Sequence, residues 1–408
     1  MKHAPRRLVS LGLLLLALAG VALQPGCATR PRTPITVTSL PPEQRARAER
    51  NLAVFHSVWD LVNRKHYQPQ THGARWEEAA AKYGPRAAAA ADEPALYVVL
   101  NEMLDGLNDS HTHALSPRRA LERHTHEKAR TGFSMVRVEQ QWVVTDVAPD
   151  SPAGGAGVSP GWIVVSRNGV PVGDQPNFNA GEGEEAVWVF RDTRDRDVPV
   201  RLVAKRLSIA ALQVVRPLPD GFVYLRFDAF DAKDRRWLSR QLQEHARAPG
   251  VVIDLRRNPG GETFSLGISI GEFFDRRVDC GTFVTREGAK KVKNSWQLGS
   301  ARYRGKVVVL VDATSASAAE IFAAVLQDHG RATIVGRKTA GAVLASWFYT
   351  LPDGGELQLS REDYRAPHGR RIEGHGVEPD IVVKRTLADV RVGRDPDLEA
   401  AMAVLRGR

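Results

Sequence analysis

Hydrophobic positions recur at helical spacing in the first part of the chain that follows its leader. Phe55, Val58 and Val62 lie three or four residues apart, and the same spacing returns between residues 96 and 107. Positions with this spacing fall on one face of a helix. We therefore expect residues 44–126 to form a small helical domain.

The pattern changes from helical spacing to alternation near residue 131. Val136, Val138 and Val144 alternate with other residues, which is typical of half-buried strands. Asn168-Gly169 is a dipeptide that favours a tight hairpin turn. We expect a separate β domain over residues 131–206.

From residue 207 to residue 385, apolar runs alternate with amphipathic stretches. The runs predict buried strands at 222–227, 250–255 and 306–311, and the stretches predict helices at 234–246 and 316–329. Alternation of this kind is typical of an α/β core. The remaining segment, 386–408, is expected to be a C-terminal tail with a short helix at 397–405.

The chain begins with a basic stretch followed by an apolar run at 8–23, which is too short for a comfortable membrane span. A small residue precedes Cys27, as in a bacterial lipobox, although Leu23 lies four rather than three positions before the cysteine. We expect 1–27 to be a lipoprotein-type signal peptide and 28–43 a tether. The protein would then be exported and held at the periplasmic side of the envelope through lipidated Cys27. The alternative is a plain cleaved signal peptide.

Composition excludes several classes of protein. With 43% hydrophobic and 25% charged residues in 408, the chain is neither wholly disordered, collagen-like nor a coiled coil. Its net charge of +10 comes mostly from scattered arginines, so nucleic acid is not an expected partner. Two cysteines cannot form a disulfide framework or a four-cysteine zinc site. Oligomeric state stays open.

Serines cluster in the stretch 312–320, between a predicted buried strand and a predicted helix. A serine there lies near the positive end of the helix dipole, where backbone N–H groups can stabilise an oxyanion. Helix capping is the simpler alternative, with Ser315 or Ser317 as the cap and Glu320 in the first turn. The stretch alone favours capping.

Further glycine-rich and polar stretches flank the serine stretch. They lie at 254–261, 327–332, 335–341, 351–355 and 373–380. In this order the series resembles the C-terminal-processing (tail-specific) serine peptidase family over residues 131–385. The resemblance implies an α/β (α+β) multidomain protein, with a ClpP/crotonase-like α/β protease core at 207–385 and no cofactor.

The β domain resembles a PDZ domain by the order of its motifs, with Trp162 where such domains usually have aspartate. The resemblance implies that one loop captures the C-terminus of a protein or peptide substrate, which is expected to be apolar. Strand addition would then hold the peptide. The residues of that loop would be Gly132, Phe133, Ser134 and Met135.

The family resemblance also maps a catalytic apparatus onto this chain. It makes Ser317 the nucleophile of an acyl transfer, with oxyanion donors from the backbone of Ala318 and from Gly260 or Gly261. Well-known members use a lysine base in the following loop, but this chain has Ala342 at that position. Alanine cannot accept a proton.

A lysine-less branch, the tricorn protease core, resembles this chain in its Thr-Ala-Gly loop. That resemblance implies that His111 is the general base and that Ser110 bridges it to Glu373. Two alternatives remain open: Lys338 as the base, or an inactive protein that binds C-terminal peptides. A helix cap at 109–112 is the structural alternative for the histidine motif.

Two His-x-His pairs suggest metal ligands, His111 with His113 and His124 with His126. The carboxylate and cysteine companions of a structural zinc site are missing, so no metal is expected.

Overall fold

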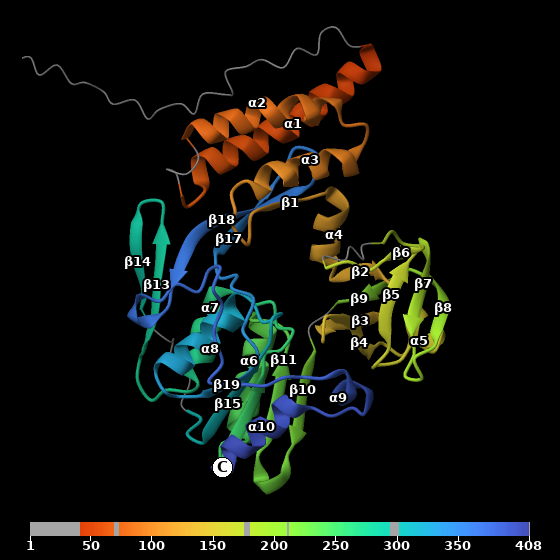
Figure 1. The fold of residues 1–408 in the computed structure, drawn as a ribbon. Helices are drawn as coiled ribbons and strands as arrows, with labels where there is room; N and C mark the ends of the chain where they lie inside the picture. Colours follow the sequence, from red (N-terminus) through yellow and green to blue (C-terminus); the bar gives the residue numbers. More distant parts are fainter. Residues whose placement is uncertain (1–40, 69–72, 175–179, 210–211, 294–301, 408) are drawn as a thin grey trace, which may run out of the picture.

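The computed structural model describes residues 41–68, 73–174, 180–209, 212–293 and 302–407. Helices, a β-rich domain and an α/β core follow one another along the chain, so the expected mixed architecture is confirmed (Figure 1). The predicted signal peptide and Cys27 lie outside the described residues. Within the described part, no helix is long and apolar enough to cross a membrane.

Three helices form the N-terminal part: α1 (Pro42–Lys65), α2 (Gly73–Ala89) and α3 (Glu93–Asp105). The predicted apolar face of α1 is confirmed, since Phe55, Val58 and Val62 are fully buried. The same apolar cluster includes leucines of β17 (Ala345–Thr350) and β18 (Glu356–Arg365). The helices therefore rest directly on a sheet of the core, as Figure 1 shows.

The segment expected to be helical up to residue 126 also contains a strand. β1 (His113–Leu115) pairs antiparallel with β18, and α4 (Pro117–Thr125) follows it. The amide of Asn101 on α3 accepts a hydrogen bond from the N–H of Ala114 and donates one to its carbonyl oxygen, at 2.8 and 3.0 Å. Three residues are too few for a hydrophobic pattern, so the sequence did not indicate this strand.

The β-rich domain contains a sheet in the order β3 (Phe133–Val138), β4 (Gln141–Val147), β5 (Ile163–Arg167), β7 (Glu185–Arg191) and β8 (Asp197–Val203). β6 (Val170–Pro171) pairs with β5, α5 (Pro152–Gly155) is one turn long, and β2 (Glu127–Arg130) pairs with β9 (Lys205–Ser208). The predicted Asn168-Gly169 turn is confirmed by positive φ angles at both residues. β3 is an edge strand of this sheet.

The core is a six-stranded sheet with helices on both faces. Its order is β10 (Gln213–Pro217), β11 (Val223–Phe227), β12 (Gly250–Asp254), β15 (Lys306–Val311), β16 (Thr333–Gly336) and β19 (Ile381–Val382), parallel except for β10. A second sheet has the order β1-β18-β13-β14, with β17 beside β18, β13 at Asp279–Thr285 and β14 at Gly288–Lys293. The short 3₁₀ turns are η2 (Pro219–Gly221) and η3 (Pro367–Gly369).

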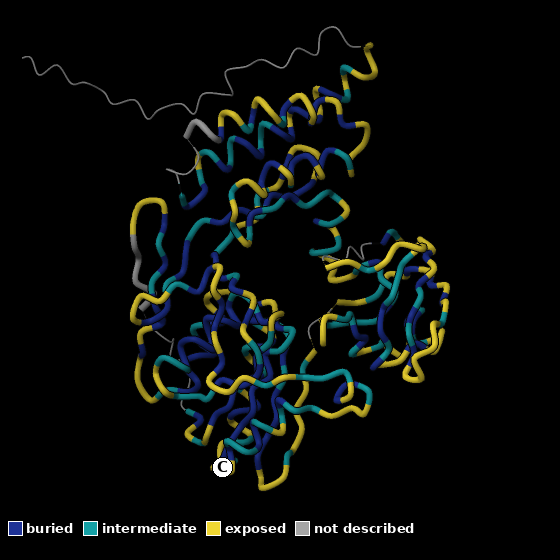
Figure 2. The backbone as a smooth tube through the Cα atoms, in the orientation of Figure 1, coloured by how far each residue is buried: buried dark blue, intermediate teal, exposed yellow. Residues whose placement is uncertain are grey.

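Both faces of β12 and β15 are buried, which explains their unbroken apolar sequence (Figure 2). One face packs against α6 (Ala232–Glu244), α7 (Thr263–Gly271) and α8 (Ala318–Asp328). The other face packs against α10 (Pro396–Leu405). The predicted strands and helices of the core are thus confirmed, each within about two residues of its expected ends.

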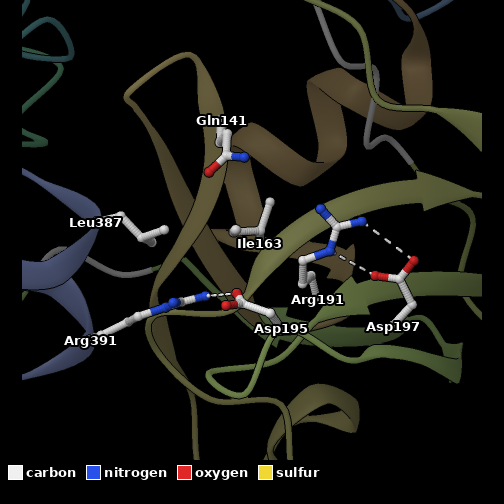
Figure 3. Close-up of a pocket in the computed structure, with 7 residues that line it drawn as sticks. All are labelled: Gln141, Ile163, Arg191, Asp195, Asp197, Leu387 and Arg391. Atoms are coloured by element: carbon white, nitrogen blue, oxygen red, sulfur yellow. Dashed lines mark hydrogen bonds and ion pairs between the residues drawn. The ribbon is translucent and has the colours of Figure 1, made fainter.

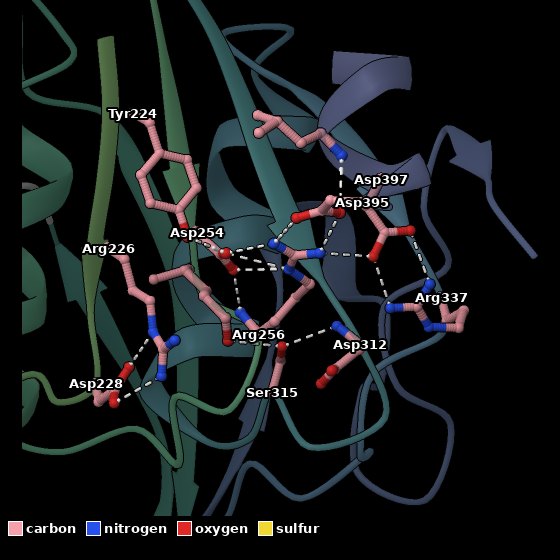
Figure 4. Close-up of polar contacts among 12 residues, drawn as sticks. Tyr224, Arg226, Asp228, Asp254, Arg256, Asp312, Ser315, Arg337, Asp395 and Asp397 are labelled. Atoms are coloured by element: carbon pink, nitrogen blue, oxygen red, sulfur yellow. Dashed lines mark hydrogen bonds and ion pairs between the residues drawn. The ribbon is translucent and has the colours of Figure 1, made fainter. Parts of the chain in front are cut away.

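The C-terminal segment packs against the core. Besides the predicted helix, now α10, it forms α9 (Leu387–Arg391). Asp397 at the start of α10 is fully buried and accepts hydrogen bonds from Arg256 and Arg337, at 2.9 and 2.7 Å (Figure 4). Arg256 also donates to Asp254 and Asp395. Each buried charge has an opposite partner, which burial requires.

α9 lies against the β-rich domain. Val390 of α9 shares an apolar cluster with Val138, Val143 and Ile163. Beside that cluster, Arg391 pairs with Asp195 at 2.8 Å, at the edge of a cavity of about 620 Å³ (Figure 3). The C-terminal segment therefore attaches the β-rich domain to the core.

Candidate active site

Ser317 lies at the turn between β15 and α8, immediately before the first helical residue. Its φ of +56° and ψ of −119° belong to a region that side chains rarely adopt, so the turn holds backbone strain. The Ser317 N–H donates to the carbonyl oxygen of Ala342 at 2.7 Å. Within the described structure, the N–H of Ala318 has no acceptor, as expected for the first turn of a helix.

The glycine loop that follows β12 touches the serine turn. A Cβ on Gly260 would lie 2.6 Å from the Cβ of Ser317 and 2.7 Å from the nitrogen of Ala318, so no larger residue fits. The Gly260 N–H already donates to Oδ1 of Asn258 at 2.9 Å. The Gly261 N–H has no acceptor among the described residues, so the arrangement favours Gly261 over Gly260 as a free donor.

Glu320 is fully buried in the first turn of α8 and organises the neighbouring loop. One carboxylate oxygen accepts hydrogen bonds from the Thr339 hydroxyl and the Gly341 N–H. The other accepts from the N–H groups of Ala342 and Ser317, at 2.8 and 3.1 Å. Glu320 therefore does more than cap a helix, since it joins the serine turn to the loop at 339–342.

The histidine motif is fixed by a buried carboxylate. Oδ1 of Asp109 accepts hydrogen bonds from the N–H groups of His111 and Thr112, at 2.9 and 2.7 Å, and from the Ser360 hydroxyl at 3.0 Å. Burial would raise the pKa of Asp109, but hydrogen bonds from His66 and Thr112 lower it overall, well below its usual range. The loop at 109–112 is thereby held against β18.

His66 also holds this loop, a contact that the sequence analysis did not predict. It follows α1, is fully buried, and places Nε2 2.8 Å from Oδ2 of Asp109. The N–H of Gln68 donates to its Nδ1 at 3.2 Å, so Nε2 carries the proton given to Asp109. The partners are 43 residues apart in the chain, and only folding brings them together.

Glu373 links the histidine loop to the serine loop. Nδ1 of His111 lies 2.6 Å from the Ser110 hydroxyl oxygen. The Ser110 N–H donates to one oxygen of Glu373 at 3.3 Å, and the Val343 N–H donates to the other at 2.8 Å. Since Val343 follows Ala342, Glu373 lies between both predicted catalytic loops. No direct hydrogen bond joins the His111 and Ser317 side chains in the described structure.

Burial shapes the protonation of this cluster. Burial lowers the pKa of His111, Asp109 opposes this and His113 adds to it, which together bring the pKa to about 4. Burial also raises the pKa of Glu373, against the hydrogen bonds from Val343 and Ser110. At neutral pH His111 is therefore uncharged and able to accept a proton.

Lys338 does not join this cluster. Its ammonium group pairs with Glu378 at 2.9 Å, and the two side chains are 55% and 65% exposed. Among the described residues, its side chain forms no hydrogen bond or ion pair with Ser317 or Glu320, and the loop residue that donates to Glu320 is Ala342. The structure therefore gives no contact by which Lys338 could serve as the base.

The other candidate residues lie apart from the serine turn. Phe133 packs against Trp188 inside the β-rich domain, and the Ser134 hydroxyl accepts a hydrogen bond from Arg257 at 2.8 Å. Met135 lies on the same edge strand, and Gly132 precedes it with a φ of +92°. Among the described residues, no three His, Cys, Asp or Glu side chains are placed to hold a metal ion.

Replacing His66 with phenylalanine should destabilise the protein, because a buried carboxylate would lose a donor. A hydrogen bond to a charged group contributes about 1.5–3 kcal/mol, which is the expected loss in the free energy of unfolding. His66→Gln, whose amide can still donate, should recover part of it. The matched control is His245→Phe, at a partly exposed site at the end of α6, and urea unfolding is the measurement. Equal stability of His66→Phe and wild type would contradict the prediction.

A strained serine at a helix start, free N–H groups beside it and a histidine–serine–glutamate series that ends on a buried carboxylate are features of a serine hydrolase. Comparison with known proteins specifies the class. Residues 221–383 match peptidase family S41, and residues 47–105 match the tricorn protease C1 domain. The chain therefore contains a peptidase family S41 domain, and its relatives are C-terminal-processing serine peptidases.

Relatives agree with this assignment. The carboxyl-terminal-processing protease of Synechocystis sp. is 28% identical over 372 residues, covering 86% of this chain and 85% of the relative. The solved photosystem II D1 C-terminal processing protease has a TM-score of 0.60 and 23% identity, covering 87% of this chain and 97% of its own. The tricorn protease has a TM-score of 0.52 and 16% identity, covering 88% of this chain and 37% of its own. The two structures support the fold.

Proposed function

We propose that this chain is an exported endopeptidase that cuts proteins recruited by their C-termini, with Ser317 as the nucleophile and His111 as the general base. The observation that carries the proposal is the position of Glu373, which receives N–H groups from Ser110 and Val343. It supports a serine–histidine arrangement in a chain that has Ala342 in place of the family's lysine.

In the proposed mechanism, Nε2 of His111 takes the proton of Ser317 as the serine oxygen attacks the peptide carbonyl carbon. The N–H groups of Ala318 and Gly261 stabilise the resulting oxyanion. The leaving amine takes the proton from His111 as the peptide bond breaks, which leaves the acyl group on Ser317. Water, activated by His111, then hydrolyses this ester and frees Ser317. Nδ1–H of His111 donates to the Ser110 hydroxyl, which in turn donates to Glu373 and keeps the ring oriented.

The step requires His111 and Ser317 to approach each other on substrate binding. Catalytic hydrogen bonds are often long in unliganded enzymes and tighten only in the complex. The two residues lie on different layers, His111 before β1 and Ser317 before α8. Closure between the helical part and the core would bring them together.

The pH dependence of cleavage should report the unusual pKa of His111. A general base acts only in its neutral form, and the pKa of His111 is about 4 because burial lowers it. We expect kcat/KM to fall as pH decreases through about 4 to 5, and to be unchanged between pH 6 and 7. Initial rates in a constant-ionic-strength buffer series would measure it. An acid limb near 6.5 would mean that His111 is more solvated than its burial indicates.

Substrate recruitment is assigned to the edge of β3, as the PDZ resemblance implies. A peptide C-terminus would meet the N–H groups at Gly132 to Met135 and extend the sheet as an added strand. Support comes from the edge position of β3 and the positive φ of Gly132.

Export and anchoring are proposed from the sequence of residues 1–27 alone. A lipidated Cys27 and the tether at 28–43 would hold the peptidase at the periplasmic face of a membrane. If this is correct, the wild-type protein expressed in a bacterium should incorporate a labelled fatty acid, and a Cys27→Ser variant should not.

An inactive protein that only binds C-terminal peptides is the second candidate. Ala342 and the missing hydrogen bond between His111 and Ser317 favour it. An acid-quench experiment separates the two. Wild-type protein is mixed with an unstructured protein that ends in apolar residues, quenched at short times and digested for mass spectrometry. A substrate fragment esterified to Ser317, absent in Ser317→Ala, supports the peptidase. Tight binding with neither adduct nor product supports the binder.

A further inference from the structure

The outer face of α6 carries a line of positively charged residues. Lys233, Arg236 and Arg240 are exposed and lie three and four residues apart, which places them on one face of the helix. Arg247, seven residues further on, continues the line in the turn after the helix and is also exposed. We call these four residues the basic stripe. None of them takes part in the cluster around Ser317 or in the mechanism above.

The basic stripe is not neutralised by the residues around it. In the part of the chain that the structure describes, its side chains form no ion pair and no hydrogen bond. Like charges at a spacing of three or four residues repel each other and destabilise a helix. The opposite face of α6 is packed, since Leu238 and Leu242 are buried in the core. The stripe is therefore an open charged surface whose repulsion an anionic partner would relieve.

Acidic residues near the basic stripe are buried or already hydrogen-bonded. Asp231 caps α6 by accepting from the N–H of Asp234 at 2.7 Å, and Asp234 itself is fully buried. Glu244 is exposed and accepts from a glutamine amide three residues earlier, at 2.8 Å. Asp275, in the loop after α7, pairs with Arg304 at 3.4 Å. Glu244 offsets part of the charge, and the surface stays positive.

The loop between α7 and β13 extends this positive surface. The hydroxyl of Ser239 on α6 donates to Glu272, at the end of α7, at 2.6 Å, so this end of α7 touches α6 beside the stripe. Arg276 and Arg277 follow in the loop, are exposed, and form no ion pair with any described residue. Cations from two elements therefore face solvent on the side of the core that α6 and α7 cover.

An anionic lipid surface is the partner that fits these charges best. Phospholipid headgroups present phosphates over a broad surface, and each Lys or Arg that approaches it adds to the attraction. The proposed anchor at Cys27 would keep the protein close, because the stretch between Cys27 and α1 spans no more than about 50 Å even when fully extended. Binders of single-stranded nucleic acid also use exposed aromatic side chains. Trp237, the aromatic residue of α6, instead packs against Phe227.

We propose that the basic stripe docks the protein on an anionic phospholipid surface, with Arg276 and Arg277 beside it. The inference rests on the proposed anchoring at a membrane and adds to it an electrostatic contact made by the folded core. A flexible tether alone leaves the orientation of the protein free. Docking through α6 would fix which face of the peptidase is turned toward the bilayer, so that substrates reach the site from one side.

Co-sedimentation with vesicles tests the inference. The chain is used from residue 28 on, the form that the proposed export leaves without its lipidated cysteine. Vesicles are either pure phosphatidylcholine or phosphatidylcholine mixed with phosphatidylglycerol. We expect tighter binding to the anionic vesicles, weakened by added salt. Replacing Lys233, Arg236 and Arg240 with glutamine should weaken this binding at least about tenfold, because each cation near such a surface contributes about fivefold in affinity.

The matched control replaces Arg194, Lys205 and Lys384 with glutamine, which changes the net charge by the same amount. These residues are exposed, lie outside α6 and form no side-chain ion pair with a described residue. Binding of the control to anionic vesicles should stay within about threefold of the starting protein, since distant exposed charges are screened. Equal losses in the two variants would overturn the inference. So would equal binding of the unsubstituted chain to both kinds of vesicle, a result that depends on no variant's folding.

Duplex DNA at the same salt concentration is the competing probe. Binding to DNA that depends on the basic stripe, without binding to vesicles, would assign the surface to nucleic acid and overturn the inference. The vesicle experiment measures neither cleavage nor acylation. A chain that neither cleaves proteins nor incorporates fatty acid, but still docks through the stripe, would therefore refute the proposed function and leave the lipid contact standing.

Discussion

Replacing Ser317 or His111 with alanine should each lower kcat/KM for protein cleavage by at least about a thousandfold, and replacing both should lower it little further. The two residues act in one step, because the serine oxygen attacks only as its proton moves to the histidine. Once either is missing, the other has nothing to act on. The remaining activity would come from substrate binding and the N–H groups of Ala318 and Gly261.

Lys338→Ala is the matched control for that prediction. The lysine is exposed and paired with Glu378, so its loss should change cleavage less than about twofold, in keeping with the small contribution of surface ion pairs. Initial rates with wild type and the four variants, each checked for folding by circular dichroism, make the comparison. If Lys338→Ala were inactive and His111→Ala active, the peptidase would stand but the base would be wrong.

The stretches around the predicted serine site lie together because they all follow strands of one sheet. β12, β15 and β16 are parallel neighbours, so the stretches after them, at 254–261, 312–320 and 335–341, meet at one edge. Loops at the carboxyl ends of parallel strands are brought together by topology alone. The family resemblance supplied the roles of the residues at that edge. The roles that it implies for His111, Ser110 and Glu373 stay predictions.

Contacts made by single residues far apart could not be predicted. Nothing in the residues after α1 indicates that His66 reaches Asp109, since a lone buried histidine has no periodic pattern. The pairing of Arg256 with Asp397 joins residues 141 positions apart. The predicted domain boundaries at 126 and 385 also stay predictions. β1, which precedes residue 126, pairs with β18 of the core, and α9, which follows residue 385, packs against the β-rich domain.

Replacing Glu320 with alanine should reduce both stability and catalysis. This result would distinguish a residue that joins the serine turn to the loop at 339–342 from one that only caps α8. A residue that only caps α8 would cost about 0.5–2 kcal/mol and leave kcat unchanged. Here three backbone N–H groups and the Thr339 hydroxyl would lose a buried acceptor. Each unsatisfied buried group costs about 1–3 kcal/mol, so we expect a loss of at least about 3 kcal/mol in the free energy of unfolding.

The same substitution should lower kcat by about tenfold or more and change KM less. The reason is that misplacement of a reacting group by about 1 Å can lower the rate about a hundredfold. Glu320 holds the N–H of Ser317 and the loop whose Ala342 carbonyl oxygen accepts it. Glu378→Ala, at an exposed acid in a nearby loop, is the control and should leave both quantities unchanged. Urea unfolding and steady-state rates measure the two effects. A loss of stability without a loss of kcat would return Glu320 to the role of a helix cap, and strain at Ser317 would then be maintained by its remaining contacts with Ala342 and Gly260.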